Sequence, residues 1–484
     1  MSFLLTVKRY SKILNWKHDT YYASLMNKYV YFDEFMRFCN DNKDQFSKRD
    51  IIASLTYIHH MKKVDLLSPI FNSYNDFICS NINIFRTNIS TLVHRYAILG
   101  HTKSLLFIYE NVIKNNILNY DNKSISLIAW SYAKNNFYLS DLFIEINKIL
   151  RACIKTMTLH ELSLIAWAYS KINRLPPLEM VCLKNRVYQL LNSLDEELNA
   201  ATQNSITEGG YINGQSVSIK EKGTQCESLE CAKNESEVKG SHAYYSSVKD
   251  DSNQRNGRNE MERHEHGLEN TYEDNDENKI DIHGCRKNLS QDICMIMKSY
   301  AIMNRTDPFF FFFLFNFIIK NIKNNKMMIT AQGITSIWVC LREYDIKNKN
   351  VIEYTLELSR FLRLDHTVNS SMMHEIVTSI HKLKIKDRRI LYHLFYHLKR
   401  KCINMHVQHL YDIIINLQEM KINDDDLWKQ FGVAIQKKAI DLELTQIKKL
   451  HNIFTTNGKG NDRILGVLDT FIQIKEDINA YGPI

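Results

Sequence analysis

Apolar residues recur along this chain at intervals of three and four positions, the spacing that places side chains on one face of an α-helix. Two nearly identical segments carry the pattern most clearly, Ser126-Leu-Ile-Ala-Trp-Ser-Tyr-Ala-Lys134 and Ser163-Leu-Ile-Ala-Trp-Ala-Tyr-Ser-Lys171, which are offset by 37 residues. Self-similarity at a fixed offset is typical of stacked supersecondary units. The tyrosine of each copy therefore serves as an anchor for finding further units.

The anchor position recurs in both halves of the chain. The anchors are Tyr57, Tyr96, Tyr132, Tyr169, Tyr300, Leu341, Ile380, Leu417 and Phe454, and most neighbours are 36–41 residues apart. A second amphipathic stretch follows many of them: Leu142–Ile154, Leu178–Leu194, Val351–Leu364, Ile390–Leu398, Leu427–Ile440 and Ile464–Ile478. Each unit is therefore predicted to be a helical hairpin, which must stack on its neighbours to bury its apolar face. The sequence predicts an all-α fold, an α-solenoid of about 37-residue hairpin repeats.

One gap interrupts the series, because Tyr169 and Tyr300 are 131 residues apart. Residues 196–288 within it are rich in Ser, Asn, Glu, Gly and Asp and poor in Leu, Ile and Phe. Such a segment buries too little apolar surface to offset the entropy of ordering, so it is predicted to be a disordered acidic insert. The predicted organisation places helical repeats at 21–195 and 289–484, on either side of this insert.

Composition supports helices and reveals an uneven charge. Gly (15) and Pro (5), which β-rich folds use in turns, are scarce. The insert holds 19 acidic and 11 basic residues, against 54 and 62 in the whole chain, so the remainder carries a net charge of +16. This positive charge outside the insert favours binding to a polyanion. A genome biased towards Lys and Asn would also make a basic surface, without any partner.

Neither the cysteines nor the longest apolar run indicates disulfide bonds, a zinc site or a membrane span. The 10 cysteines form no CxxC pair, which favours a reducing compartment and argues against disulfides or structural zinc. The run that starts at Phe309 is interrupted at Asn316 and ended by Lys320, so it is too short to span a membrane. No metal, cofactor or membrane partner is expected.

The first 18 residues contain no acid and carry Lys8, Arg9, Lys12 and Lys17 among apolar residues. This composition is typical of a mitochondrial presequence, here assigned to residues 1–20. An ordinary N-terminal helix is the alternative.

The copies at 126–134 and 163–171 resemble the first helix of organellar heptatricopeptide repeats, relatives of the octotricopeptide repeats. Many proteins of that family also carry a C-terminal RAP domain. The resemblance covers roughly 45–195 and 289–478, and is weak at Tyr57 and in the last three units. It implies an α-solenoid of the mitochondrial matrix that binds RNA, either organellar ribosomal RNA or transcripts, with mitoribosomal proteins as further partners. Residues 464–484 indicate a closing helix and a short tail instead of a RAP domain, which lowers any expectation of catalysis.

Six cations near the ends of first helices are the candidate RNA-binding residues: Lys134, Lys171, Lys298, Arg342, Lys382 and Lys384. A row of cations along one edge of a repeat array would follow a phosphate backbone. Lysine near a helix C-terminus also stabilises the helix dipole without any ligand. Similarly, Trp130, Trp167 and Trp338 fit the core between repeats better than they fit base stacking.

These observations together predict a non-catalytic RNA-binding protein of the mitochondrion, with no catalytic residue and no DNA partner. The alternative is a protein-binding scaffold of the same architecture, or a structural mitoribosomal component that contacts mainly protein. An enzyme would rest on no residue that the sequence identifies.

Overall fold

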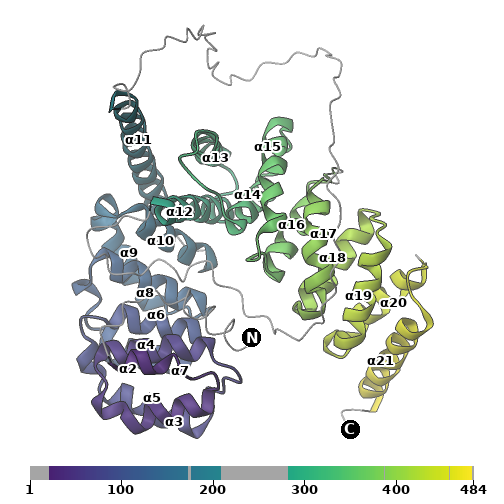
Figure 1. The fold of residues 1–484 in the computed structure, drawn as a ribbon, viewed down its shortest axis with the longest axis horizontal. Coiled ribbons are helices and arrows are strands. Elements are labelled where there is room, and N and C mark those ends of the chain that lie inside the picture. Colours follow the sequence, from purple (N-terminus) through teal and green to yellow (C-terminus); the bar gives the residue numbers. More distant parts are fainter. Residues whose placement is uncertain are drawn as a thin grey trace. The chain divides into compact units, whose positions relative to one another are not determined.

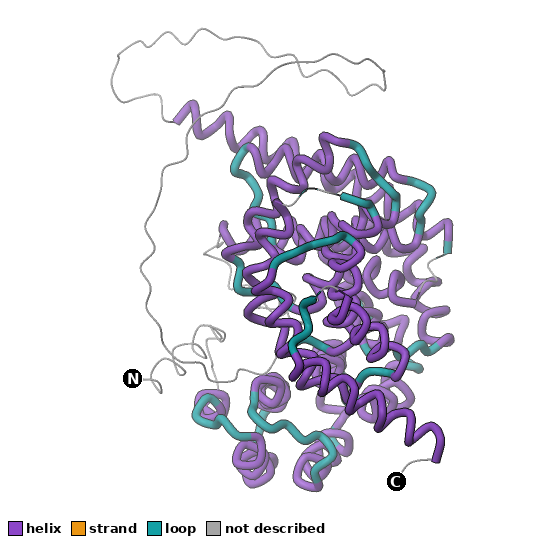
Figure 2. Tube along the Cα trace, turned by 90° about the vertical axis from the view of Figure 1, so that its right-hand side faces the viewer, coloured by secondary structure: helices purple, strands orange, loops and turns teal. Residues whose placement is uncertain are grey.

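The computed structural model describes residues 21–208 and 282–481, except 173–175, 386, 388 and 457. Every regular element among them is a helix, and short loops join consecutive helices (Figure 2). None of these described helices is long and apolar enough to cross a membrane, the phenylalanine-rich α13 (Pro308–Lys323) included. The predicted all-α fold class is confirmed, while the predicted presequence at 1–20 lies outside the described residues.

The helices alternate between two kinds, which we call first and second helices. The first helices contain the anchors: α4 (Lys48–His60), α6 (Ile89–Leu99), α8 (Asn122–Lys134), α10 (Leu159–Ile172), α12 (Ile282–Met303), α14 (Ala331–Glu343), α16 (Ser370–Lys382), α18 (Val407–Glu419) and α20 (Leu444–Thr456). Each is followed by its second helix: α5 (Pro69–Ser80), α7 (Thr102–Ile108), α9 (Ser140–Cys153), α11 (Pro177–Glu208), α13, α15 (Lys349–Ser359), α17 (Arg389–Lys401), α19 (Asp425–Lys438) and α21 (Asp462–Tyr481). All the predicted anchors lie in first helices.

Packing follows chain order, and most helices contact the helix two places further on. First helices contact one another in an unbroken series from α4 to α20, and second helices do so from α15 to α21. Figure 1 shows the same order in the run of colours from purple to yellow. The arrangement is consistent with a helical repeat.

In several first helices a side-chain cap lies at the same distance before the anchor. Asp121 accepts a hydrogen bond from the backbone N–H of Ser124 at 2.8 Å, and Thr330 accepts one from Gly333 at 3.1 Å. Asn369 does the same for α16. All three caps stand eleven residues before their anchors. Because each cap satisfies a backbone donor that the helix leaves free, the starting point of the helix is fixed locally.

The ends of the first helices repeat as well. The anchor carbonyl accepts a hydrogen bond from the backbone N–H five residues later, as in Phe137 to Tyr132 at 3.0 Å and Ile346 to Leu341 at 2.9 Å. The residue four places after the anchor has a positive φ in many units: Gly100, Asn136, Asp345, Lys384, Lys421 and Gly458. This is the Schellman end of a helix. Backbone geometry therefore keeps the period even where side-chain similarity has faded.

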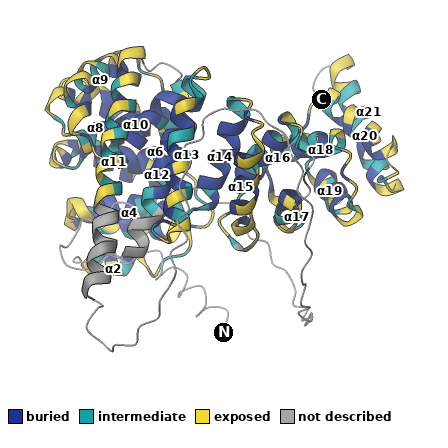
Figure 3. Ribbon diagram, turned by 90° about the horizontal axis from the view of Figure 1, so that it is seen from above, coloured by how far each residue is buried: buried dark blue, intermediate teal, exposed yellow. Residues whose placement is uncertain are grey.

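First helices form the buried layer of the protein. In α8 every residue from Ile125 to Ala133 is buried, and in α14 every residue from Gly333 to Leu341. Figure 3 shows α14 and α16 mainly in dark blue, whereas α15 carries exposed residues in yellow. Trp130 and Trp338 are buried here, as the sequence predicted. A first helix is enclosed by its own second helix and by the first helices on both sides.

A further helical pair, α2 (Tyr21–Met26) and α3 (Phe32–Asn42), precedes the predicted series. It packs on α4 and α5 in the same way as the later pairs. Phe32, Phe35, Met36 and Cys39 are buried at helical spacing. The search for repeats within the sequence missed this pair, because α2 and α3 share no residues with the anchor motif.

The helices that flank the predicted insert run past its predicted ends. α11 continues to Glu208 and α12 begins at Ile282, whereas the sequence placed the insert at 196–288. Residues 196–208 contain neither Gly nor Pro, so nothing there breaks a helix before Gly209 and Gly210. The predicted disorder of residues 209–281 lies outside the described residues.

Candidate functional site

The six predicted cations occupy five consecutive first helices. Lys134 and Lys171 end α8 and α10, Lys298 lies within α12, Arg342 is near the end of α14, and Lys382 and Lys384 lie at the end of α16. Since each of these helices packs against the next, the cations form a series that follows the stack. We refer to them as the cation row.

In α8 and α10 the lysine of the cation row lies over a tryptophan one helical turn earlier. The ammonium of Lys134 is 5.2 Å from the ring centre of Trp130, and that of Lys171 is 5.3 Å from Trp167. This is a cation–π arrangement within one helix face. Lys171 is exposed and Lys134 is half-buried. The apolar ring holds each charge in a defined place beside the helix end.

The two tryptophans also join neighbouring repeats. Their ring centres are 5.6 Å apart, and His94 of α6 lies 5.0 Å from Trp130 on the other side. Trp130 is only 3% exposed, and its indole N–H has no acceptor within the described residues. The stack His94–Trp130–Trp167 is therefore chiefly a contact between repeats, as the sequence analysis favoured.

Lys298 is the next cation of the row, in α12. It lies two residues before its anchor, which is the position that Trp130 and Trp167 occupy in their own repeats. Burial lowers its pKa, and the positive charges of Lys171 and Arg342 lower it further, against the opposite influence of Glu375. No hydrogen bond or ion pair of its ammonium occurs within the described part of the chain. Three cations from α10, α12 and α14 thus lie within electrostatic range of one another, and the carboxylate of Glu375 lies within the same range of Lys298.

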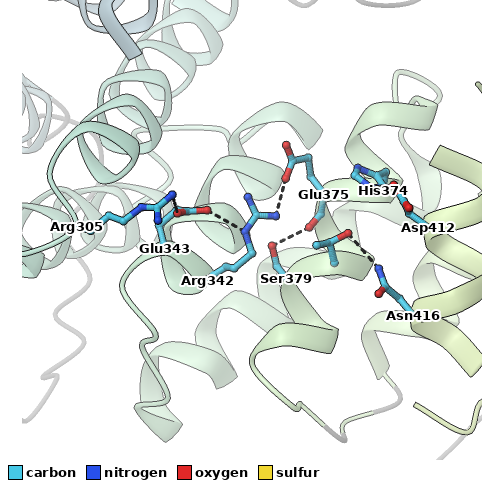
Figure 4. A network of polar contacts seen from close by, with 9 residues as sticks. Arg305, Arg342, Glu343, His374, Glu375, Ser379, Asp412 and Asn416 are labelled. Atoms are coloured by element: carbon cyan, nitrogen blue, oxygen red, sulfur yellow. Dashed lines mark hydrogen bonds and ion pairs between the residues drawn. The ribbon is translucent and has the colours of Figure 1, made fainter. Parts of the chain in front are cut away.

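Arg342, in contrast, is held by acids. Its guanidinium donates to Glu375 of α16 at 2.7 Å and to Glu343 at 3.0 Å, and Arg305 pairs with Glu343 at 2.8 Å (Figure 4). The Arg342 side chain is only 13% exposed. Sequence spacing predicted this residue as part of the row, and the structure shows that its charge is largely used in joining α14 to α16.

Polar contacts continue in the same manner to α18. His374 pairs with Asp412 at 3.1 Å, and Asn416 donates to Thr378 at 3.2 Å (Figure 4). His381 pairs with Glu419 at 2.9 Å. From α14 to α18 the first helices are therefore connected by the Arg342–Glu375 ion pair and by polar contacts between their own side chains.

Lys382 and Lys384 are both exposed. Lys384 has φ 56° and is the left-handed residue that ends α16, so its backbone has a structural role of its own. Both lysines are separated from Lys298 by the acids around Arg342. The structure brings Lys171, Lys298 and Arg342 together and leaves Lys382 and Lys384 at the far end of the row.

One cationic hollow escaped the sequence analysis. It is lined by Arg360, Arg363, His393 and Tyr396, and lies on the side of the second helices. Its residues come from two elements about 30 positions apart and do not belong to the anchor motif. A run of Arg, His and Tyr at helical spacing in α17 was the available signal.

The Arg342–Glu375 pair is expected to make stability depend on pH. The pKa of Glu375 is lowered: burial opposes this, but the charges of Lys298 and Arg342 and the hydrogen bond from Arg342 outweigh it. A carboxylate with a lowered pKa in the folded state stabilises the fold above its ordinary value of 4.5, and this contribution is lost as the pH falls through the folded-state value. The loss of unfolding free energy caused by Glu375→Gln should thus be larger at neutral pH than below pH 4.5.

Urea unfolding of the wild type, Glu375→Gln, Arg342→Ala and the double variant would measure this coupling. Arg342→Ala alone is expected to cost about 1–3 kcal/mol, because it leaves the partly buried carboxylate of Glu375 without its guanidinium donor. The double variant should cost less than the sum of the single changes. Additive costs that do not change with pH would contradict the pair's role.

The described residues contain no group of three or more His, Cys, Asp or Glu side chains placed to hold a metal ion. Burial raises the pKa of the thiols of Cys294 and Cys340, which belong to the core. No protein-family model matches the chain, and no curated protein matches it in sequence.

Proposed function

We propose that this chain is a non-catalytic, RNA-binding α-solenoid of about 37-residue hairpin repeats, similar to heptatricopeptide-repeat proteins. The cation row provides the contact with the phosphate backbone. RNA needs a series of fixed cations with a regular spacing, and a stack of first helices supplies one such position per repeat.

The observation that carries the proposal is the cluster of Lys171, Lys298 and Arg342. Burial lowers the pKa of Lys298, and the charges of Lys171 and Arg342 lower it further, while Glu375 offsets them in part, so an additional anion bound beside these cations would reduce the cost of the buried charge. A phosphate group would relieve the repulsion and raise the pKa of Lys298. Lys134 and Lys171, each over its tryptophan, extend the positive charge along α8 and α10.

The charge of the chain supports the same partner. Outside residues 196–288 the net charge is +16, as calculated above from the sequence. The acid-free first 18 residues and the family resemblance support a mitochondrial location, where ribosomal RNA or transcripts would be the bound RNA. Work in mitochondrial ribosome assembly, or as part of that ribosome, fits the same proposal.

The salt dependence of RNA binding tests the proposal. Single-stranded RNA of mixed sequence should bind with an affinity that falls steeply with salt, with a slope of log affinity against log salt of about −2 to −3 for three or four phosphate contacts. Crosslinking the protein in its organelle and sequencing the attached RNA would identify the target. Salt-insensitive binding, together with crosslinks to proteins alone, would contradict the RNA proposal.

A protein-binding scaffold is the second candidate, and one observation favours it. From α14 to α18 polar side chains of the first helices pair with one another, as in Arg342–Glu375 and His374–Asp412. A neutral, polar surface of this kind suits a protein partner better than a phosphate backbone. The two proposals therefore differ in the partner that they assign to the first helices from α14 to α18.

A further inference from the structure

The hollow on the side of the second helices lies where η6 (Arg360–Leu364), which extends α15, meets α17. Its volume is about 380 Å³, and Arg360, Arg363, His393 and Tyr396 line it. It is formed by elements of neighbouring repeats, whose helices α15 and α17 contact each other. The hollow is therefore part of the packed structure and has a defined position.

The described residues that line this hollow include no carboxylate. Arg360 uses its Nε to donate to the backbone carbonyl of Glu357 at 3.2 Å, which leaves its terminal amino groups for other acceptors. Neither Arg360 nor Arg363 forms an ion pair within the described residues, whereas Arg389 pairs with both Glu353 and Asp387. Two guanidinium groups thus face a small space with no anion to balance them.

The histidine of the hollow is affected by the same charges. Burial lowers the pKa of His393, and the positive charges of Arg363 and Arg360 lower it further. Its Nδ1 is buried and has no hydrogen-bond partner in the part of the chain that the structure describes. A buried polar atom without a partner is unfavourable, so a group that hydrogen-bonds there would be stabilised.

Exposed aromatic rings alternate with the arginines. The guanidinium of Arg363 lies 5.0 Å from the ring centre of Tyr392, and that of Arg400 lies 5.2 Å from Tyr396. Tyr392 is 58% exposed and Tyr396 is 39% exposed. Arg400 also donates to the hydroxyl of Tyr396. Exposed rings held in place by cations are suited to stacking on unpaired bases.

The residues of α17 around the hollow are not repeated in the next unit. In α19, 37 residues further on, the positions of Tyr392, His393, Tyr396 and Arg400 are taken by Lys429, Gln430, Val433 and Lys437. The helix can therefore pack in the stack without these aromatic residues. Packing alone does not account for two exposed tyrosines, a buried unpaired histidine nitrogen and unpaired arginines in one place.

We propose that this hollow binds one nucleotide of a single RNA strand. Arg360, Arg363 and His393 contact the phosphate, and Tyr396 or Tyr392 stacks on the base. Two forked guanidinium groups match phosphate geometry, and neighbouring rings supply a surface for any base. The proposal rests on the proposed function for the source of the nucleotide, since a free mononucleotide has the same chemistry.

The test uses the full-length chain, with a short oligouridylate, uridine monophosphate and inorganic phosphate as probes. Arg360→Gln with Arg363→Gln should lower the affinity for oligouridylate at least tenfold, since both residues are exposed and their replacement leaves the core unchanged. The matched control is Lys429→Gln with Lys437→Gln, at exposed positions of α19, which should change the affinity less than threefold. Oligouridylate with 4-thiouridine should crosslink to residues 389–401 in the wild type and lose that crosslink in the arginine variant.

The outcomes separate this inference from the proposed function. Salt-dependent RNA binding that the arginine variant leaves unchanged, without a crosslink in α17, would overturn the nucleotide site and leave the proposed function standing. Arginine-dependent binding of uridine monophosphate without any binding of oligouridylate would overturn RNA as the source and the proposed function with it. Equal losses in the arginine and control variants would show a general effect of charge and also overturn the site.

Discussion

Reversing three lysines of the cation row, Lys134→Glu, Lys171→Glu and Lys382→Glu, is expected to lower the affinity for single-stranded RNA by about 100-fold or more at moderate salt. Each lost phosphate contact removes about 0.7 from the slope of log affinity against log salt, so three contacts near 0.1 M salt correspond to about two powers of ten. The new carboxylates repel the backbone and increase the loss. Titrations at several salt concentrations would measure both the affinity and the slope.

Arg342 and Lys298 are left out of this variant on purpose. Arg342 joins α14 to α16 through Glu375, and Lys298 lies among other charges in α12, so changing either would disturb packing. The matched control reverses three exposed lysines of the second-helix side, Lys103, Lys155 and Lys349, and changes the net charge by the same amount. Equal losses from the two variants would mean that RNA does not follow the cation row.

Trp338→Ala is expected to lower the local free energy of unfolding by about 4 kcal/mol. The side chain is fully buried in α14, and its Nε1 donates to the hydroxyl of Ser359 in α15 at 3.0 Å. The substitution leaves a cavity at the contact of first and second helix and removes that hydrogen bond. Because each repeat contacts only its neighbours, hydrogen exchange should speed up most in α14 and α15.

A pair of Trp→Phe variants separates the contribution of the hydrogen bond to stability from the contribution of side-chain volume. Trp338→Phe loses both volume and the bond to Ser359, whereas Trp130→Phe removes an indole N–H that has no acceptor among the described residues. Trp338→Phe should therefore cost about 1 kcal/mol more than Trp130→Phe in thermal or urea unfolding. Equal costs would mean that the hydrogen bond contributes nothing to stability.

The repeat could be recognised from the sequence because its ends are set locally. A cap eleven residues before the anchor and a left-handed residue four after it recur even where the anchor has changed from Tyr132 to Leu341. Backbone hydrogen bonding at helix ends depends on residues close in the chain, which one sequence reveals. The pair α2–α3 carried the same apolar spacing but none of the motif residues.

The candidate site was predicted only in part, since its electrostatics depends on contacts across repeats. The period placed Lys171, Lys298 and Arg342 in register, and the structure brings them together. The period did not reveal that Glu375 would pair with Arg342, because helix spacing does not specify which side chains of neighbouring helices contact each other. For the same reason the hollow at Arg360 and His393 could not be found by comparing repeats.

The contact between α10 and α12 has a consequence for how this chain can be divided. Asp292 of α12 accepts hydrogen bonds from Ser163 at 2.7 Å and from His160 at 2.9 Å, and the two helices pack like any neighbours in the series. Two separately made polypeptides, one ending after α11 and the other beginning before α12, would therefore present to each other the same complementary surfaces that the intact chain joins. Because these contacts are made by residues of the two helices themselves, the sequence between α11 and α12 can change in length between descendants of this gene while the stack stays in register.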